Sequence, residues 1–217
     1  MESQEENFHV LENKWVLSEQ YYIENKTDRL KGYENSFEKL CVIGTVETFW
    51  CFWKQIPAIA DVFFDGTEKI VERTDTSNSS TLVRKCRIIG QCIFKEGIEP
   101  KYEDPNNEKG GHLMCVFSKE DHDTLSIFWE CVVISLIGES LDNGNNITGA
   151  RVIDKSNISN NQINYRVEIW FRNWEDEAFK ASLLAETEKL LQLCGCTSAK
   201  TSIETNDYSK WMTKESK

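Results

Sequence analysis

Two spacings of apolar residues alternate along the chain, and together they predict helices set among strands. From Thr45 to Pro57, apolar side chains fall at the i, i+3, i+4 and i+7 positions of a helix, with Thr45 as its N-cap and Pro57 as its stop. The same spacing predicts helices over residues 123–140 and 176–193, and Gly195 is placed to end the second of these. Runs rich in β-branched and aromatic residues predict strands at 15–22, 88–94, 112–117, 150–154 and 163–171. Helices inserted among strands of antiparallel appearance indicate the α+β class.

The strand at 163–171 separates two kinds of side chain by its alternation. A core-facing side is predicted for Ile163, Tyr165, Val167, Ile169 and Phe171. The opposite side then carries Asn164, Arg166, Glu168 and Trp170. A tryptophan beside an arginine on a polar face has two explanations. Either a loop or helix covers the ring, or the face binds a ligand through a flat ring and a cation.

A second candidate site lies in a proline-bounded loop before residue 112. Glu99, Tyr102, Glu103 and Asp104 place one aromatic ring among carboxylates, and a Gly-Gly pair ends the loop. One interpretation is a solvated acidic loop. The other is a carboxylate that accepts two N–H donors beside a stacking ring, which suits the N1–H and exocyclic amine of guanine.

Composition narrows the choice of ligands and of cellular compartment. The net charge of −11 and the pI near 4.9 argue against sequence-independent binding along a phosphate backbone, so any nucleic-acid contact should be small and local. No apolar run approaches the roughly 18 residues of a membrane helix, and the acidic, polar N-terminus resembles no secretory signal or transit peptide. The eight cysteines are therefore expected as free thiols of a cytoplasmic protein.

Signatures of enzymes and metal sites are missing from the sequence. No phosphate-binding loop, dinucleotide fingerprint, nucleophile elbow or zinc-protease motif occurs, so we expect no catalytic residues, no cofactor and no metal. The three histidines are scattered, and His122 is expected at the surface because it lies in a charged run. The expected organisation is a flexible N-terminus at 1–8, one domain at 9–196 with a mobile insertion at about 65–87, and a weakly structured tail at 197–217.

Several blocks taken together make the chain resemble the cap-binding eukaryotic translation initiation factor 4E family. They are HVLENKW (9–15), TVETFW (45–50), FKEGIEPKYED (94–104), Gly110-Gly111, FWECVVISLIGES (128–140), GARV (149–152) and YRVEIWFRN (165–173). The resemblance implies a curved antiparallel sheet with about three helices on its convex face. It also implies a concave pocket for the 7-methylguanosine cap of mRNA.

The resemblance assigns roles in that pocket to particular residues. Two rings would sandwich the methylated base, a carboxylate would pair with its edge, another ring would contact the methyl group, and two cations would hold the triphosphate. In that order these residues are Tyr33 and Tyr102, Glu103, Trp170, and Lys155 with Arg166. Most members carry Trp at both sandwich positions, so the two tyrosines predict a weaker cation–π term and lower cap affinity. His112 replaces a position that is often basic in the family.

The family's second site is a convex surface that docks a helical peptide from a 4G-type scaffold or from an inhibitory 4E-binding protein. The resemblance places it at His9, Val46, Trp50, Ile134 and Gly138, with Trp50 as the anchor. The alternative for Trp50 is a plain core residue. Glu130, Cys131 and Val10 depart from the family pattern and predict a different partner affinity or partner sequence.

These observations favour a monomeric, non-enzymatic cap-binding factor that recruits the translation machinery. A divergent translational repressor with weak cap affinity is the alternative within the same fold. A nucleotide hydrolase using the loop carboxylates, or an interaction domain with an inactive pocket, would belong to other classes.

Overall fold

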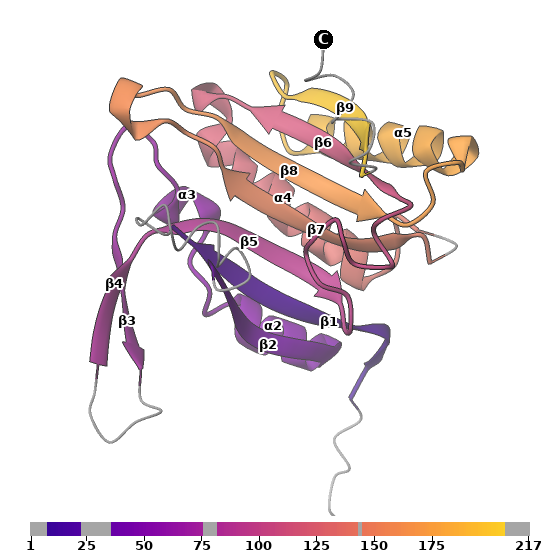
Figure 1. Cartoon of the computed structure of the whole chain (residues 1–217), viewed down its shortest axis with the longest axis horizontal. Helices are drawn as coiled ribbons and strands as arrows, with labels where there is room; N and C mark the ends of the chain where they lie inside the picture. The colour runs from indigo at the N-terminus through magenta and orange to yellow at the C-terminus, as the bar shows by residue number, and fades with distance from the viewer. Residues whose placement is uncertain (1–7, 23–35, 76–81, 143–144, 207–217) are drawn as a thin grey trace, which may run out of the picture.

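A computed structural model describes residues 8–22, 36–75, 82–142 and 145–206 of the chain. Its main feature is one antiparallel sheet with strand order β2-β1-β5-β7-β8-β6-β9 (Figure 1). In that order the strands are Phe37–Thr45, Val10–Tyr21, Ile88–Lys95, Ile147–Asp154, Tyr165–Phe171, Gly111–Phe117 and Lys200–Thr205. The predicted strands all lie in this sheet. Among the described residues, no helix has the length and apolar character needed to cross a membrane.

Helices cover one face of the sheet and leave the other face open (Figure 1). They are α2 (Val46–Trp53), α3 (Ile59–Val62), α4 (His122–Ile137) and α5 (Glu177–Leu193), with single 3₁₀ turns at Lys119–Asp121 and Ile158–Asn160. The α+β class, with an antiparallel sheet and helices packed on it, is confirmed. We call the two sides of the sheet the helix face and the open face.

The ends of the helices follow from local chemistry in the sequence. Thr45 begins α2, because its hydroxyl accepts a hydrogen bond from the backbone N–H of Thr48 at 3.1 Å. Gly195 follows α5 with φ +76°, a conformation that glycine adopts without strain. The N–H groups of Gly195 and Cys196 then bond to the carbonyls of Gln192 and Leu191, which closes the helix. Both predicted boundaries are confirmed.

Strand β8 divides the core from the open face as its alternation predicts. Tyr165, Val167, Ile169 and Phe171 join the large cluster between the sheet and the helices. Trp170 instead joins a small second cluster with Cys92 and Phe94 on the open face. Gly110 lets the loop before β6 approach β8 closely, since a Cβ there would overlap the carbonyl oxygen of Phe171. The loop that carries Tyr102 is thereby brought to β8.

Two regions contain more regular structure than the sequence predicts. Residues 71–75 and 82–86 form a two-stranded antiparallel hairpin, β3 (Val71–Asp75) and β4 (Leu82–Cys86), inside the expected mobile insertion. The expected weak structure of the tail is wrong for residues 200–205, because β9 pairs with β6. The polar sequence KTSIET gives no strand signal, because none of the six side chains of this strand is fully buried. Most of the N-terminus expected to be flexible, residues 1–7, lies outside the described residues, as do 76–81 and 207–217.

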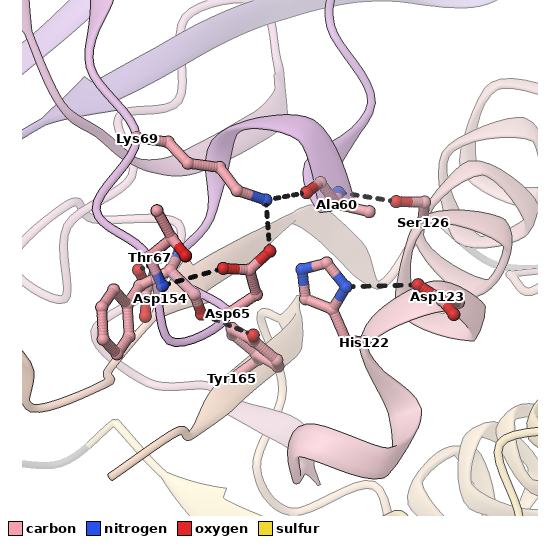
Figure 2. Close-up of polar contacts among 10 residues, drawn as sticks. Ala60, Asp65, Thr67, Lys69, His122, Asp123, Ser126, Asp154 and Tyr165 are labelled. Carbon is pink, nitrogen blue, oxygen red and sulfur yellow. Dashed lines mark hydrogen bonds and ion pairs between the residues drawn. The ribbon is translucent and has the colours of Figure 1, made fainter. Parts of the chain in front are cut away.

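A polar network fastens α3 and the residues after it to α4 and β8 (Figure 2). The Tyr165 hydroxyl donates to the Phe64 carbonyl at 2.6 Å, and the Ala60 N–H donates to Ser126 of α4 at 2.9 Å. His122 points into this network with its ring 5.7 Å from that of Tyr165, and its Nε2 is buried. The expected exposure of His122 is therefore wrong, because α4 turns the ring inward.

Candidate functional site

Aromatic rings gather on the open face where β8 meets the loop between β5 and β6. The ring of Tyr102, from the loop, stacks on that of Trp170 with centroids 4.5 Å apart and planes 10° apart. Phe94 meets Trp170 edge-on at 5.6 Å, and His112 lies 5.9 Å from it. Trp170 is fully buried, so the loop does cover this ring, as one of the two explanations for its strand position required.

The loop that carries Tyr102 is shaped by its own polar side chains. Asp104 accepts hydrogen bonds from the backbone N–H groups of Glu99 and Asn106 at 2.9 and 2.8 Å. Asn107 donates to the carbonyls of Glu99 and Lys101. Partial burial opposes the charge of Asp104, but these hydrogen bonds outweigh it and lower its pKa. Glu103, between these anchors, projects to solvent.

A buried ion pair lies beneath the stacked rings. Arg151 of β7 is opposite Glu168 of β8, and its Nε donates to the Glu168 carboxylate at 2.7 Å. Trp170 Nε1 donates to the same carboxylate oxygen at 3.0 Å. Burial alone would raise the pKa of Glu168, but the charge of Arg151, the nearby His112 and these hydrogen bonds hold it below its ordinary value. The sheet floor therefore carries a fixed anion and a fixed cation.

A hollow of about 430 Å³ opens beside the rings. Its lining contains four cationic side chains, two carboxylates and two aromatic rings, which are Lys101, Arg151, Lys155, Arg166, Glu103, Glu168, Tyr102 and Trp170. A second hollow of about 260 Å³ shares Tyr102, Arg166 and Glu168, and is also lined by His112 and by Glu204, Thr205 and Asn206 at the end of β9. The concentration of cations stands out in a chain whose net charge is −11.

Two of these cations lie at the rim, where phosphate groups could reach them. Lys155 follows β7 and reaches solvent, and Arg166 projects from β8. Desolvation lowers the pKa of Lys155, and the neighbouring charges of Arg151 and Arg166 lower it further. An anionic ligand would relieve this repulsion, so the site favours negative charge at the rim.

The structure brings most of the expected cap-site residues together. Tyr102, Glu103, Trp170, Lys155 and Arg166 all line the larger hollow. Tyr33 lies outside the described residues. His112 is buried, with Nδ1 2.9 Å from the side-chain oxygen of Asn206, and so faces the smaller hollow. Because Tyr102 stacks directly on Trp170, the two rings enclose no space for a base in this conformation.

The sequence alone does not predict that Arg151 and Glu168 form the charged floor of the hollow. The sequence puts Glu168 on the polar face of its strand and Arg151 in the GARV block, and assigns neither of them a role. A signal is present, since an arginine in the middle of the mainly apolar strand ITGARVID needs a counter-charge when it is buried. Only the strand register shows that Glu168 supplies it.

The expected partner surface lies on the helix face. Trp50 and Val46 of α2 and Ile134 of α4 are exposed apolar side chains, and Gly138 follows α4 at the surface. Trp50 is 38% exposed, which argues against a plain core role. His9 is held against α2, because its carbonyl accepts from Val46 N–H at 3.0 Å and its ring bonds Glu47 at 2.6 Å.

A smaller hollow of about 160 Å³ lies between α2, α3 and α4. Trp53 Nε1 donates to Glu130 across it at 3.1 Å, which gives a structural use for the acidic residue at 130. Among the residues that the structure describes, no group of three or more His, Cys, Asp or Glu side chains is arranged to hold a metal ion.

Comparison with known sequences gives a family match over two thirds of the chain. The model of the family "Eukaryotic initiation factor 4E" matches residues 74–217. Initiation factor 4E1 of Drosophila melanogaster is 28% identical over 169 residues, which cover 78% of this chain and 52% of that protein. Initiation factor 4E of Bos taurus is 30% identical over 146 residues, which cover 66% of this chain and 54% of that protein. The chain thus spans about half the length of these relatives.

Comparison with solved structures shows the same fold. The complex of Caenorhabditis elegans eIF4E-3 with the 4E-binding protein Mextli has a TM-score of 0.66 at 23% identity, covering 94% of this chain and 96% of that chain. The complex of Ascaris suum eIF4E-3 with the m2,2,7G cap has a TM-score of 0.62 at 26% identity, covering 86% of each chain.

Proposed function

Because this chain belongs to the eukaryotic initiation factor 4E family, we propose that its open-face hollow binds the 7-methylguanosine cap of mRNA. Factors of this family bind caps and are not enzymes. The observation that carries the proposal is the joint presence of stacking rings and clustered cations in one hollow of an acidic protein. A cap offers the matching chemistry, which is a flat cationic base joined to a triphosphate.

Each side chain takes a role that its chemistry permits. Tyr33 and Tyr102 stack on the two faces of the base, and Glu103 accepts hydrogen bonds from its N1–H and amine. Trp170 contacts the methyl group, and Lys155 and Arg166 hold the phosphates. Glu103 suits its role because it lines the hollow and projects to solvent before binding. Tyr102 must leave its stack on Trp170 for the base to enter.

The interaction energies are sufficient for a specific site. A cation–π contact gains about 0.5–2 kcal/mol per ring. Stacking adds roughly 1–3 kcal/mol per base, and a hydrogen bond to a charged group adds about 1.5–3 kcal/mol. Opening the Tyr102–Trp170 stack costs about 0.5–1.5 kcal/mol. These gains exceed the cost of opening the stack, and two Tyr rings contribute less than two Trp rings would.

Tryptophan fluorescence during titration with 7-methyl-GTP, and separately with GTP, tests the proposal. We expect saturable quenching by the methylated nucleotide and much weaker quenching by GTP. The Trp170→Phe variant should lose most of the signal change, whereas Trp50→Phe, on the opposite face, should keep it. Saturable quenching by neither nucleotide would refute cap binding.

For the helix face, we propose docking of a helical peptide from a 4G-type scaffold or an inhibitory 4E-binding protein. The exposed apolar side chains on α2 and α4 support it, as does the likeness to eIF4E-3, whose solved complex contains the 4E-binding protein Mextli. On this proposal the chain acts as a monomer in the cytoplasm and recruits the translation initiation scaffold.

The alternative role is a divergent repressor, which binds the cap weakly and recruits an inhibitory partner. The two tyrosines at the sandwich positions favour it, since both rings are weaker cation–π acceptors than Trp. Identification of the proteins retained on the helix face separates the two roles. A scaffold that recruits ribosomes indicates activation, and a partner that blocks recruitment indicates repression.

A further inference from the structure

Arg151 lies at the floor of the larger hollow and shares its counter-ion with Trp170. It is only 8% exposed, although an arginine side chain is normally solvated. One carboxylate oxygen of Glu168 accepts from Arg151 Nε at 2.7 Å and from Trp170 Nε1 at 3.0 Å. The guanidinium and the indole are therefore held side by side through the same atom.

The guanidinium also lies against the two stacked rings. Its central carbon is 4.8 Å from the Trp170 ring centroid and 5.7 Å from the Tyr102 ring centroid. Its Nη2 donates to the Tyr102 hydroxyl at 3.2 Å. The two distances to the ring centroids lie within the range of a cation–π contact. Trp170 is thus already in contact with a cation of the protein, and so is Tyr102 while it stays in the stack.

This arrangement affects methylated and unmethylated guanine differently. N7 methylation gives the base a positive charge, and that charge is what the rings should recognise. A second cation on the same rings repels the first and has already polarised them. Neutral guanine experiences no such repulsion and still gains stacking and edge hydrogen bonds. Glu168 offsets part of the Arg151 charge, but its Oε2 already accepts hydrogen bonds from Arg151 and Trp170.

We propose that Arg151 is a specificity-determining residue of the hollow, an internal cation that lowers its preference for N7-methylated over unmethylated guanine nucleotides. The inference rests on the proposed cap binding and adds a selectivity to it. Glu168 is the positioning residue, since it holds the guanidinium against Trp170. Replacing both charges together should give rings that are free to interact with the charge of the ligand alone.

The test is the ratio of the dissociation constants for GTP and 7-methyl-GTP, measured by fluorescence titration of the full chain. In Arg151→Met/Glu168→Gln, both charges are gone and the packing volume is kept. We expect this ratio to rise about three- to tenfold over wild type. If that variant shows no cooperative thermal transition, Arg151→Gln/Glu168→Gln carries the same prediction, because it keeps a hydrogen bond between β7 and β8.

Arg166→Met is the matched control, because it removes a cation from the rim and not from the rings. It should weaken the binding of both nucleotides and leave the ratio of their dissociation constants unchanged. An unchanged ratio in the folded double variant, with wild-type binding intact, would overturn the role of Arg151 and leave cap binding standing. Wild-type protein that binds neither nucleotide would overturn cap binding, and the inference with it.

Discussion

The ring of Tyr102 lies parallel to that of Trp170, 4.5 Å away, so a loop residue rests on a strand residue in the centre of the open face. Hydrogen bonds join Asp104 to Glu99 and Asn107 to Lys101 across Tyr102, which limits how far the ring can move. Binding of a base between tyrosines therefore exchanges one stack for another. The gain from binding depends on how strongly each ring attracts a positive charge.

We expect Tyr33→Trp and Tyr102→Trp each to tighten binding of 7-methyl-GTP by about two- to tenfold, because indole is a better cation–π acceptor than phenol. Isothermal titration calorimetry measures the change without relying on the added fluorophore. In both variants the affinity for GTP should rise less than the affinity for 7-methyl-GTP. Weaker binding of the methylated nucleotide by both would contradict the tyrosine sandwich.

Trp50→Ala should reduce retention of a peptide with the sequence pattern Tyr-x-x-x-x-Leu-Φ by at least about tenfold, because a buried aromatic anchor contributes about 2 kcal/mol to such interfaces. Leu193→Ala is a matched control, since Leu193 is 83% exposed and lies on α5. It should retain the peptide as wild type does. Equal retention by Trp50→Ala would count against the helix-face site.

Glu168→Gln should lower the free energy of unfolding at pH 7 by about 3 kcal/mol, because it leaves Arg151 buried without its counter-charge. The pKa of Glu168 is lowered in the folded state, so its stabilisation is present above the ordinary Glu pKa of about 4.3. That stabilisation is lost as the pH falls through the folded-state pKa. Urea denaturation from pH 7 to pH 3 should therefore show the difference between the two proteins shrinking below about pH 4.

Glu103→Gln is the control for that series, since Glu103 is exposed in the same hollow. Its free energy of unfolding should stay within about 0.5 kcal/mol of wild type at each pH. If the difference in free energy of unfolding between Glu168→Gln and wild type stays constant down to pH 3, the ion pair is not the cause of the destabilisation.

Tyr165→Phe should lower the free energy of unfolding by about 1–2 kcal/mol, because the carbonyl of Phe64 loses its donor at 2.6 Å. This corresponds to a fall in Tm of roughly 2–8 °C. Tyr22→Phe, at an exposed position, should leave Tm nearly unchanged. Equal Tm values for Tyr165→Phe and wild type would show that water replaces the hydroxyl freely.

The cysteines should differ in their reaction with a thiol reagent at pH 8. Burial raises the pKa of Cys92 to about 12, so it forms little thiolate, whereas Cys51 on α2 is exposed. A fast phase should disappear in Cys51→Ser and persist in Cys92→Ser. If the fast phase survives in Cys51→Ser, a cysteine other than Cys51 causes it and the prediction is wrong.

Elements with strong local signals could be predicted from the order of the amino acids alone. Thr45 and Gly195 act through their own backbone neighbours, so the start of α2 and the end of α5 could be predicted without tertiary information. The predicted stop at Pro57 is wrong, because α2 already ends at Trp53. The alternation of β8 likewise placed Trp170 opposite the core. Weak local signals failed, since β9 is polar and is stabilised by its pairing with β6.

The side chains that meet on the open face are set by strand register and loop packing. The register of β7 and β8 sets Arg151 opposite Glu168, and the fold of the loop brings Tyr102 onto Trp170. These contacts join residues far apart in sequence, and no pattern of polarity within one strand encodes them. Arg151 can be buried because Glu168, on the neighbouring strand β8, balances its charge.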